Sequence, residues 1–82
     1  MRLQRSAVSR IRLRAGFSSA GKAAAAVGCS RVHMHNIERG ASRPSFELKA
    51  RMAETYAVSM DDLAKALAAV RKELLRRLME AG

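Results

Sequence analysis

Residues 18–38, SSAGKAAAAVGCSRVHMHNIE, decide the fold of this chain. Their alanine-rich first half favours a helix, because alanine has the highest helix propensity, and Gly28 ends it. Ser30 can cap a second helix, which continues to about Arg39 and stops at Gly40. The stretch therefore predicts two short helices joined by a tight turn.

The second of these helices has a narrow apolar side. At about 100° per residue, Met34 and Ile37 share one face with Glu38. Because an apolar stripe two residues wide cannot pack on both sides, the opposite face is expected to stay free. The residues on that face and its flanks are Arg31, Val32, His33, His35, Asn36 and Arg39.

Two further helices are expected before and after this pair. Ser6 can cap one that runs to about Ala15 and ends at Gly16, a position expected to adopt a positive φ. Pro44 and Ser45 start another. Its expected inward residues are Phe46, Ala50, Met52, Ala53 and Tyr56.

A last helix is predicted from Met60 almost to the end of the chain. Ser59 can cap it, and Asp61 and Asp62 lie in its first turn, where the helix dipole favours acids. No glycine or proline interrupts the segment before Gly82. Its apolar positions include Leu63, Leu67, Val70, Leu74, Leu75 and Leu78.

The composition predicts one small all-α domain. Hydrophobic residues make up 49% of the 82 residues and aromatic ones only 4%, and the abundant alanine, leucine, arginine and methionine are good helix formers. A core of this size is marginal, so a partner subunit would stabilise it. The single cysteine excludes an internal disulfide and fits a reducing compartment. With no signal peptide or membrane span in the pattern, a cytoplasmic location is expected.

Positive charge is concentrated in the first half of the chain. Residues 1–43 hold nine Lys or Arg and one acid, a balance of +8, whereas residues 44–82 hold seven and six, a balance of +1. Solubility alone would not require this asymmetry. It indicates that the first half meets a polyanionic surface.

The arrangement resembles the phage-repressor (Cro/C1 or XRE-type) helix-turn-helix family over roughly residues 8–66. The segments IERGASRPS and VSMDDL are its most specific parts. The residues that carry the resemblance are Ile11, Arg12, Gly16, Ala23, Gly28, Ser30, Met34, Ile37, Glu38, Gly40, Pro44, Ser45, Ala53, Val58, Ser59 and Leu63. It implies a five-helix repressor-like domain with an extended C-terminal helix. It also implies a regulator that binds double-stranded DNA, usually as a homodimer and in many cases as a repressor of a palindromic operator.

The same resemblance implies which residues contact DNA, since the second helix of the pair enters the major groove. The implied base contacts are Arg31, Val32 and Asn36, with His33 and His35 beside them. The implied phosphate contacts after that helix are Arg39, Ser42 and Arg43. Ala20 replaces a glutamine that commonly clamps a phosphate, so Ser18, Ser19 and Lys22 are expected to substitute for it.

Arg12 and Glu38 match a pair that family members bury between the first and third helices. Glu38 is the only acid in the basic half and lies on the inward side of its helix. An isolated buried carboxylate is costly, so a charged partner is expected. Ala57 occupies a position where the family commonly has glycine.

The C-terminal helix leaves two alternatives open. It can pack entirely on its own domain through Leu63, Leu67 and Val70, or it can add a dimer interface. The expected interface residues are Val70, Leu74, Leu75 and Leu78. The predicted organisation is therefore a flexible basic arm at 1–5, a helix-turn-helix domain at 6–66 and a dimerisation segment at 67–82.

The sequence has no catalytic pattern: it lacks paired carboxylates, a Ser/His/Asp arrangement and a phosphate loop, so no enzyme activity and no cofactor are expected. Cys29, His33 and His35 do not predict a metal site, because the two histidines diverge by about 200° around a helix. Two alternatives to the sequence-specific regulator remain. One is an antitoxin-type protein whose C-terminal helix binds a protein partner, and the other is a low-specificity nucleoid or RNA-binding module.

Overall fold

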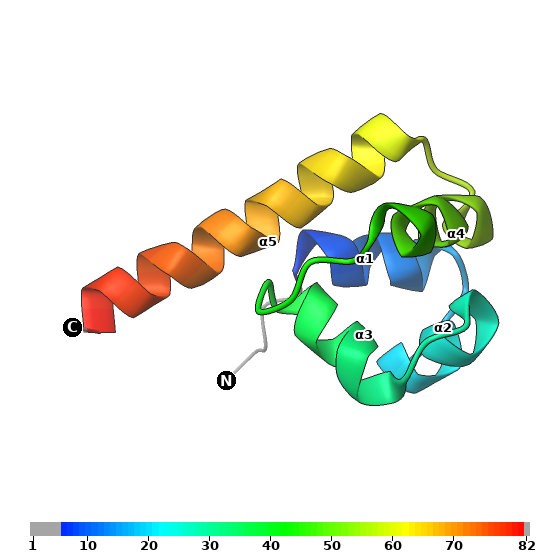
Figure 1. Ribbon diagram of the computed structural model, residues 1–82, viewed down its shortest axis with the longest axis horizontal. Helices are drawn as coiled ribbons and strands as arrows, with labels where there is room; N and C mark the ends of the chain where they lie inside the picture. The colour runs from blue at the N-terminus through cyan, green and yellow to red at the C-terminus, as the bar shows by residue number, and fades with distance from the viewer. Residues whose placement is uncertain (1–5, 82) are drawn as a thin grey trace.

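A computed structural model describes residues 6–81, which form five helices and no strands (Figure 1). The helices are α1 (Ala7–Arg14), α2 (Ala20–Val27), α3 (Arg31–Glu38), α4 (Phe46–Tyr56) and α5 (Met60–Ala81). The predicted all-α fold is confirmed. The basic arm predicted at residues 1–5 lies outside the described residues.

All five helices begin with the same kind of cap. At each start a serine Oγ accepts a hydrogen bond of 3.0–3.1 Å from the backbone N–H three residues later. This bond satisfies a backbone donor that has no partner within the helix. The capping residues are Ser6, Ser19, Ser30, Ser45 and Ser59.

The ends of α3 and α4 use left-handed backbone conformations. Gly40, just after α3, has φ = 87°, and Ala57, just after α4, has φ = 57°. Glycine adopts this region freely, whereas alanine meets a steric penalty there. Packing also requires a glycine at position 40, because a Cβ there would lie 2.7 Å from the carbonyl oxygen of Val70 in α5.

Side chains from all five helices meet in one core. The largest fully buried ones come from α1, α3, α4 and α5, and the small residues of α2 let it approach α3 closely. Burying each large side chain stabilises the fold by about 1.5–3 kcal/mol. These large residues are Val8, Met34, Ile37, Met52 and Leu63, and those of α2 are Ala23, Ala24 and Val27.

The prediction that Phe46 points inward is wrong. Phe46 is 73% exposed, and Leu48, which was not among the predicted inward residues, is buried at 6% exposure. The buried side of α4 runs through Leu48, Met52 and Tyr56 at intervals of four residues. Phe46 is two residues from Leu48, about 200° around the helix, and so faces away from the core.

Helix α5 extends well past the rest of the domain (Figure 1). Its buried residues are Leu63, Ala66 and Val70, and no position from 71 to 81 is buried. Val70 therefore packs in the core of its own domain, at 6% exposure, and its part in a dimer interface stays a prediction. No described helix is both long and apolar enough to cross a membrane.

Ion pairs form on the exposed side of the distal half of α5, residues 71–81. Arg76 pairs with Glu73 and Glu80, and Arg77 pairs with Glu73 at 3.1 Å. The hydrogen bond from Arg76 lowers the pKa of Glu73. Because all four side chains are well exposed, these pairs favour the helix only modestly.

Candidate nucleic-acid interface

The turn between α2 and α3 is fixed by backbone hydrogen bonds and by α4. The N–H groups of Gly28 and Cys29 both donate to the carbonyl oxygen of Ala24, at 2.8 and 3.0 Å. Arg51 of α4 donates from Nε to the carbonyl oxygen of Val27 at 3.0 Å, which satisfies an acceptor at the end of α2. Burial raises the pKa of the Cys29 thiol, against the opposing effect of Arg51. The thiol therefore stays protonated at neutral pH.

The inner face of α3 rests on apolar and aromatic groups. Met34 and Ile37 have no exposed surface. The Tyr56 hydroxyl donates to Met34 Sδ at 3.8 Å, and the Tyr56 and Phe17 ring centroids lie 5.9 Å apart at 56°. Burial, with a smaller contribution from Glu38, raises the pKa of Tyr56 to about 12.

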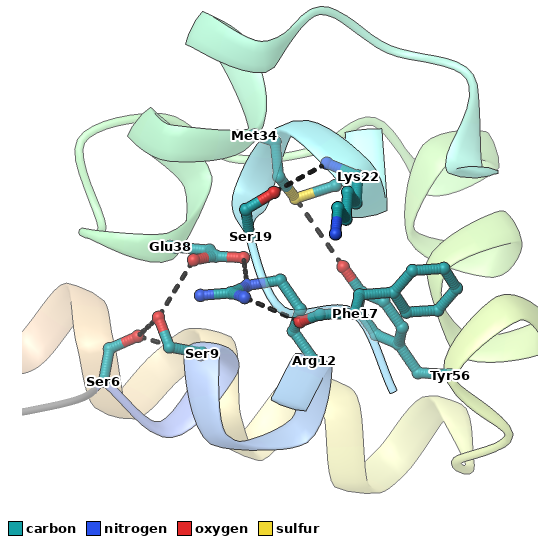
Figure 2. Close-up of polar contacts among 9 residues, drawn as sticks. All are labelled: Ser6, Ser9, Arg12, Phe17, Ser19, Lys22, Met34, Glu38 and Tyr56. Carbon is teal, nitrogen blue, oxygen red and sulfur yellow. Dashed lines mark hydrogen bonds and ion pairs between the residues drawn. The ribbon is translucent and has the colours of Figure 1, made fainter. Parts of the chain in front are cut away.

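Arg12 of α1 and Glu38 of α3 form a buried ion pair (Figure 2). Arg12 Nε lies 2.7 Å from Glu38 Oε2, and Arg12 Nη1 donates to the Phe17 carbonyl oxygen at 2.8 Å. Ser9 Oγ donates to the other carboxylate oxygen, Oε1, at 2.9 Å, and Ser6 Oγ donates to Ser9 Oγ at 3.0 Å. These contacts fix the C-terminal end of α3 to α1.

The outer face of α3 carries the predicted base-contacting residues. Arg31, Val32 and His35 are exposed, Val32 at 64%, whereas His33 and Asn36 are half-buried. This face adjoins no other helix strongly enough to bury it. It offers a guanidinium, an amide, two imidazoles and an apolar group to a ligand.

Asn36 makes contacts that the sequence did not predict. Its side-chain Oδ1 accepts a hydrogen bond from Arg39 Nε at 3.3 Å. Its backbone carbonyl oxygen accepts from the N–H groups of Ala41 and Ser42, at 2.9 and 3.2 Å. Asn36 therefore orients Arg39 and closes the turn after α3, in addition to presenting its amide.

The predicted phosphate-contacting residues lie at two places. Ser18, Ser19 and Lys22 are exposed at the start of α2, where Ser19 Oγ accepts from the Lys22 N–H and keeps its own hydroxyl proton available. Arg39 and Arg43 are exposed at the end of α3 and in the loop after it, and Ser42 is half-buried there.

The loop after α3 is fastened to α5. Arg71 Nη1 donates to the Gly40 carbonyl oxygen at 3.2 Å, close to the backbone contact between Gly40 and Val70. Arg71 Nε is buried without a hydrogen-bond partner within residues 6–81. Arg51 and Arg71 are anchors that the charge pattern could not distinguish from solvated arginines.

A groove of about 650 Å³ lies beside this loop, along one side of α5. Its apolar lining includes Ile37, Pro44 and Leu67, and it continues outward along Leu75 and Met79. Lys49, Lys72 and Arg43 are among the cations that border it. Leu75 and Met79 are 47% and 82% exposed, so residues 6–81 leave this apolar surface uncovered.

Within the described part of the chain, no three His, Cys, Asp or Glu side chains gather as metal ligands would. Cys29, His33 and His35 are therefore not brought together as a three-ligand site.

A family model described as "Helix-turn-helix domain" matches residues 7–67, well over half of the chain. No curated protein and no solved structure matches the chain. The matched region spans α1 to the first third of α5 and contains the α2–turn–α3 unit whose geometry is described above. The chain belongs to the helix-turn-helix domain family, whose fold indicates a DNA-binding regulator.

Proposed function

We propose that this protein is a homodimeric transcriptional regulator, acting as a repressor, that reads a palindromic operator in double-stranded DNA. The observation that carries the proposal is the division of α3 into two faces. Its inner face is locked by the core and by the Arg12–Glu38 pair, and its outer face is exposed and basic. A short helix held in this way is suited to enter the major groove.

The outer face supplies base-reading groups at exposed Arg31 and Val32 and at half-buried Asn36. Arg31 can donate two hydrogen bonds to O6 and N7 of guanine, Asn36 can pair with N6 and N7 of adenine, and Val32 can contact a thymine methyl group. The hydrogen bond from Arg39 to Asn36 Oδ1 supports this role by limiting rotation of the amide. His33 and His35 contact base edges or phosphate beside them.

Phosphate contacts would fix the register of α3 without reading sequence. We assign them to the start of α2, where two hydroxyls and a cation are exposed, and to the end of α3 and the loop after it, where two cations are exposed beside a half-buried hydroxyl. The residues are Ser18, Ser19, Lys22, Arg39, Ser42 and Arg43. Concentration of +8 in residues 1–43 supports this assignment.

We propose that a second copy of the chain packs against the exposed apolar side of the distal half of α5. Leu75, Leu78 and Met79 form an exposed apolar surface that the domain itself does not bury, with half-buried Leu74 beside it. In a two-fold dimer the same surface would meet itself. The same surface also fits the alternative of a heterologous protein partner, which the native mass of the free protein distinguishes.

Selection from a random pool of duplexes tests DNA reading. The wild-type protein should enrich a sequence with two symmetry-related half-sites. Arg31→Ala should lose about 1–3 kcal/mol of discrimination at one base pair of each half-site, whereas Arg43→Ala should weaken all duplexes alike and lower the salt dependence. Enrichment of no sequence, together with a steep salt dependence, would instead identify a low-specificity nucleic-acid binder.

Native mass tests the dimer. The free wild-type protein should have twice the chain mass, and Leu78→Gln should shift the equilibrium toward the monomer. Lys65→Gln, at another exposed position of α5, is the matched control and should leave the mass unchanged. A monomeric wild-type protein at micromolar concentration would contradict the homodimer and favour the heterologous partner.

A further inference from the structure

Gly21 occupies an unusual position for a glycine. Among the glycines at 16, 21, 28 and 40, it is the one that lies inside a helix and lacks a positive φ. Glycine weakens a helix relative to alanine, and α2 reads AGKAAAAV, with alanine at most other positions. Backbone conformation therefore does not require glycine at position 21.

The neighbouring side chain supplies a reason. A Cβ at position 21 would lie 3.1 Å from Arg31 Cδ and 3.6 Å from Arg31 Cγ. Carbon atoms pack best at about 3.5–4.0 Å, so the nearer of these contacts would force Arg31 to move. The aliphatic stem of Arg31 thus lies across α2 at the place where glycine leaves room for it.

We propose that Gly21 is a positioning residue for DNA reading, because it lets α2 hold the Arg31 stem in one place. The inference rests on the proposed function, in which the Arg31 guanidinium bonds to guanine. A free arginine loses much side-chain entropy when it is immobilised on DNA. An arginine whose stem already lies against α2 loses less, so Gly21 raises affinity for the correct base pair without touching DNA.

If Gly21 has this role, its replacement should change the stability of the fold and the sequence specificity of DNA binding in opposite directions. Replacing Gly21 by alanine or leucine should strengthen α2, since both residues favour helices. The same replacements should displace the Arg31 stem, slightly for alanine and fully for leucine. The expected outcome is a protein that melts at the same or a higher temperature and reads its operator less well.

The test compares Gly21→Ala, Gly21→Leu and the control Ala25→Leu, which adds the same side chain at an exposed position of α2. The probes are the duplex that the wild-type protein selects from a random pool, the same duplex with the Arg31-dependent base pair exchanged, and a random duplex. Gly21→Leu should weaken binding to the selected duplex at least about fivefold, the lower end for one bidentate contact. Gly21→Ala should fall between wild type and Gly21→Leu, and Ala25→Leu should match wild type.

A protein that already carries Arg31→Ala shows whether Gly21→Leu acts through Arg31 or weakens DNA binding independently of it. There, Gly21→Leu should change binding no further, because residues that act through one contact are not additive. An equal loss in both backgrounds, or an unchanged preference for the selected duplex in Gly21→Leu, overturns the inference. If Arg31→Ala alone leaves the base preference unchanged, the proposed base contact fails instead.

Discussion

Glu38 Oε2 lies 2.7 Å from Arg12 Nε, and both side chains are only 8% exposed. The pair connects α1 with the end of α3, and hydrogen bonds from Ser9 and to the Phe17 carbonyl oxygen occupy further atoms of both groups. A buried charge pair of this kind is stable only while both members are present. It therefore makes the position of α3 depend on two residues far apart in the sequence.

Removal of one member should destabilise the fold strongly. Glu38→Ala leaves the Arg12 guanidinium buried without its counter-ion, which costs about 3–5 kcal/mol. Urea unfolding followed by circular dichroism measures the loss as a lower midpoint. The double variant Arg12→Met/Glu38→Leu should recover most of the stability, since it leaves no buried charge. An unchanged midpoint in Glu38→Ala would contradict a structural role for the pair.

Alkaline pH should destabilise the protein through Tyr56. Its folded pKa of about 12 lies above the ordinary value of 10.0, mainly because the phenol is buried. The neutral phenol therefore contributes stability that is fully present below pH 10 and is lost as the pH rises toward 12. Tyr56 is the only tyrosine and the chain has no tryptophan, so tyrosinate absorbance reports this group alone. Tyr56→Phe should weaken the pH dependence of the melting temperature in this window, and an ordinary tyrosinate titration near pH 10 would contradict it.

Gly40 and Gly16 offer a matched test of the contact between α3 and α5. Both have positive φ, 87° and 98°, so alanine at either position costs roughly 1–2 kcal/mol of backbone strain. At Gly40 the added Cβ would also lie 2.7 Å from the Val70 carbonyl oxygen, whereas at Gly16 it meets nothing within 4 Å. Gly40→Ala should therefore lose about 1–3 kcal/mol more than Gly16→Ala in urea unfolding. Equal losses would show that the close approach of the two backbones has no energetic effect.

Ala57→Gly should stabilise the protein. Ala57 has φ = 57°, and relief of its left-handed strain is worth roughly 1–2 kcal/mol. The greater freedom of glycine in the unfolded chain offsets about 0.4–1 kcal/mol of this gain. Differential scanning calorimetry should show a higher melting temperature. Ala25→Gly, in the middle of α2, is the control and should lower it, because glycine there costs about 1 kcal/mol.

Local signals in the sequence predicted the helices and their ends. The serine caps of α1, α3, α4 and α5 and the glycine after α3 each depend on a few neighbouring residues, and the structure has all of them. Phe46 was misplaced because Phe46, Ala50 and Ala53 also have helical spacing, whereas the face of α4 that the core buries runs through Leu48, Met52 and Tyr56. Val70 packs in the core, as expected in both alternatives for the C-terminal helix.

Only some of the contacts around the candidate site could be predicted from the sequence. A charged partner for Glu38 could be expected, since an inward acid in a basic region needs one, and the family resemblance implied that this partner is Arg12. The Arg39–Asn36 bond, the Arg51 contact with α2 and the Arg31 stem over Gly21 depend on how particular side chains lie in three dimensions. The glycine inside an alanine-rich helix was the signal available for the last of these.

The absence of a side chain at Gly40 has a mechanical consequence. Backbone meets backbone where the end of α3 reaches α5, so no flexible group lies between them to absorb a displacement. In the proposed dimer each α5 would be rigidly connected to the α3 of its own subunit, so the two helices would move as one unit. The distance between the two DNA half-sites would then be set by the angle at which the two α5 helices cross rather than by the length of a linker.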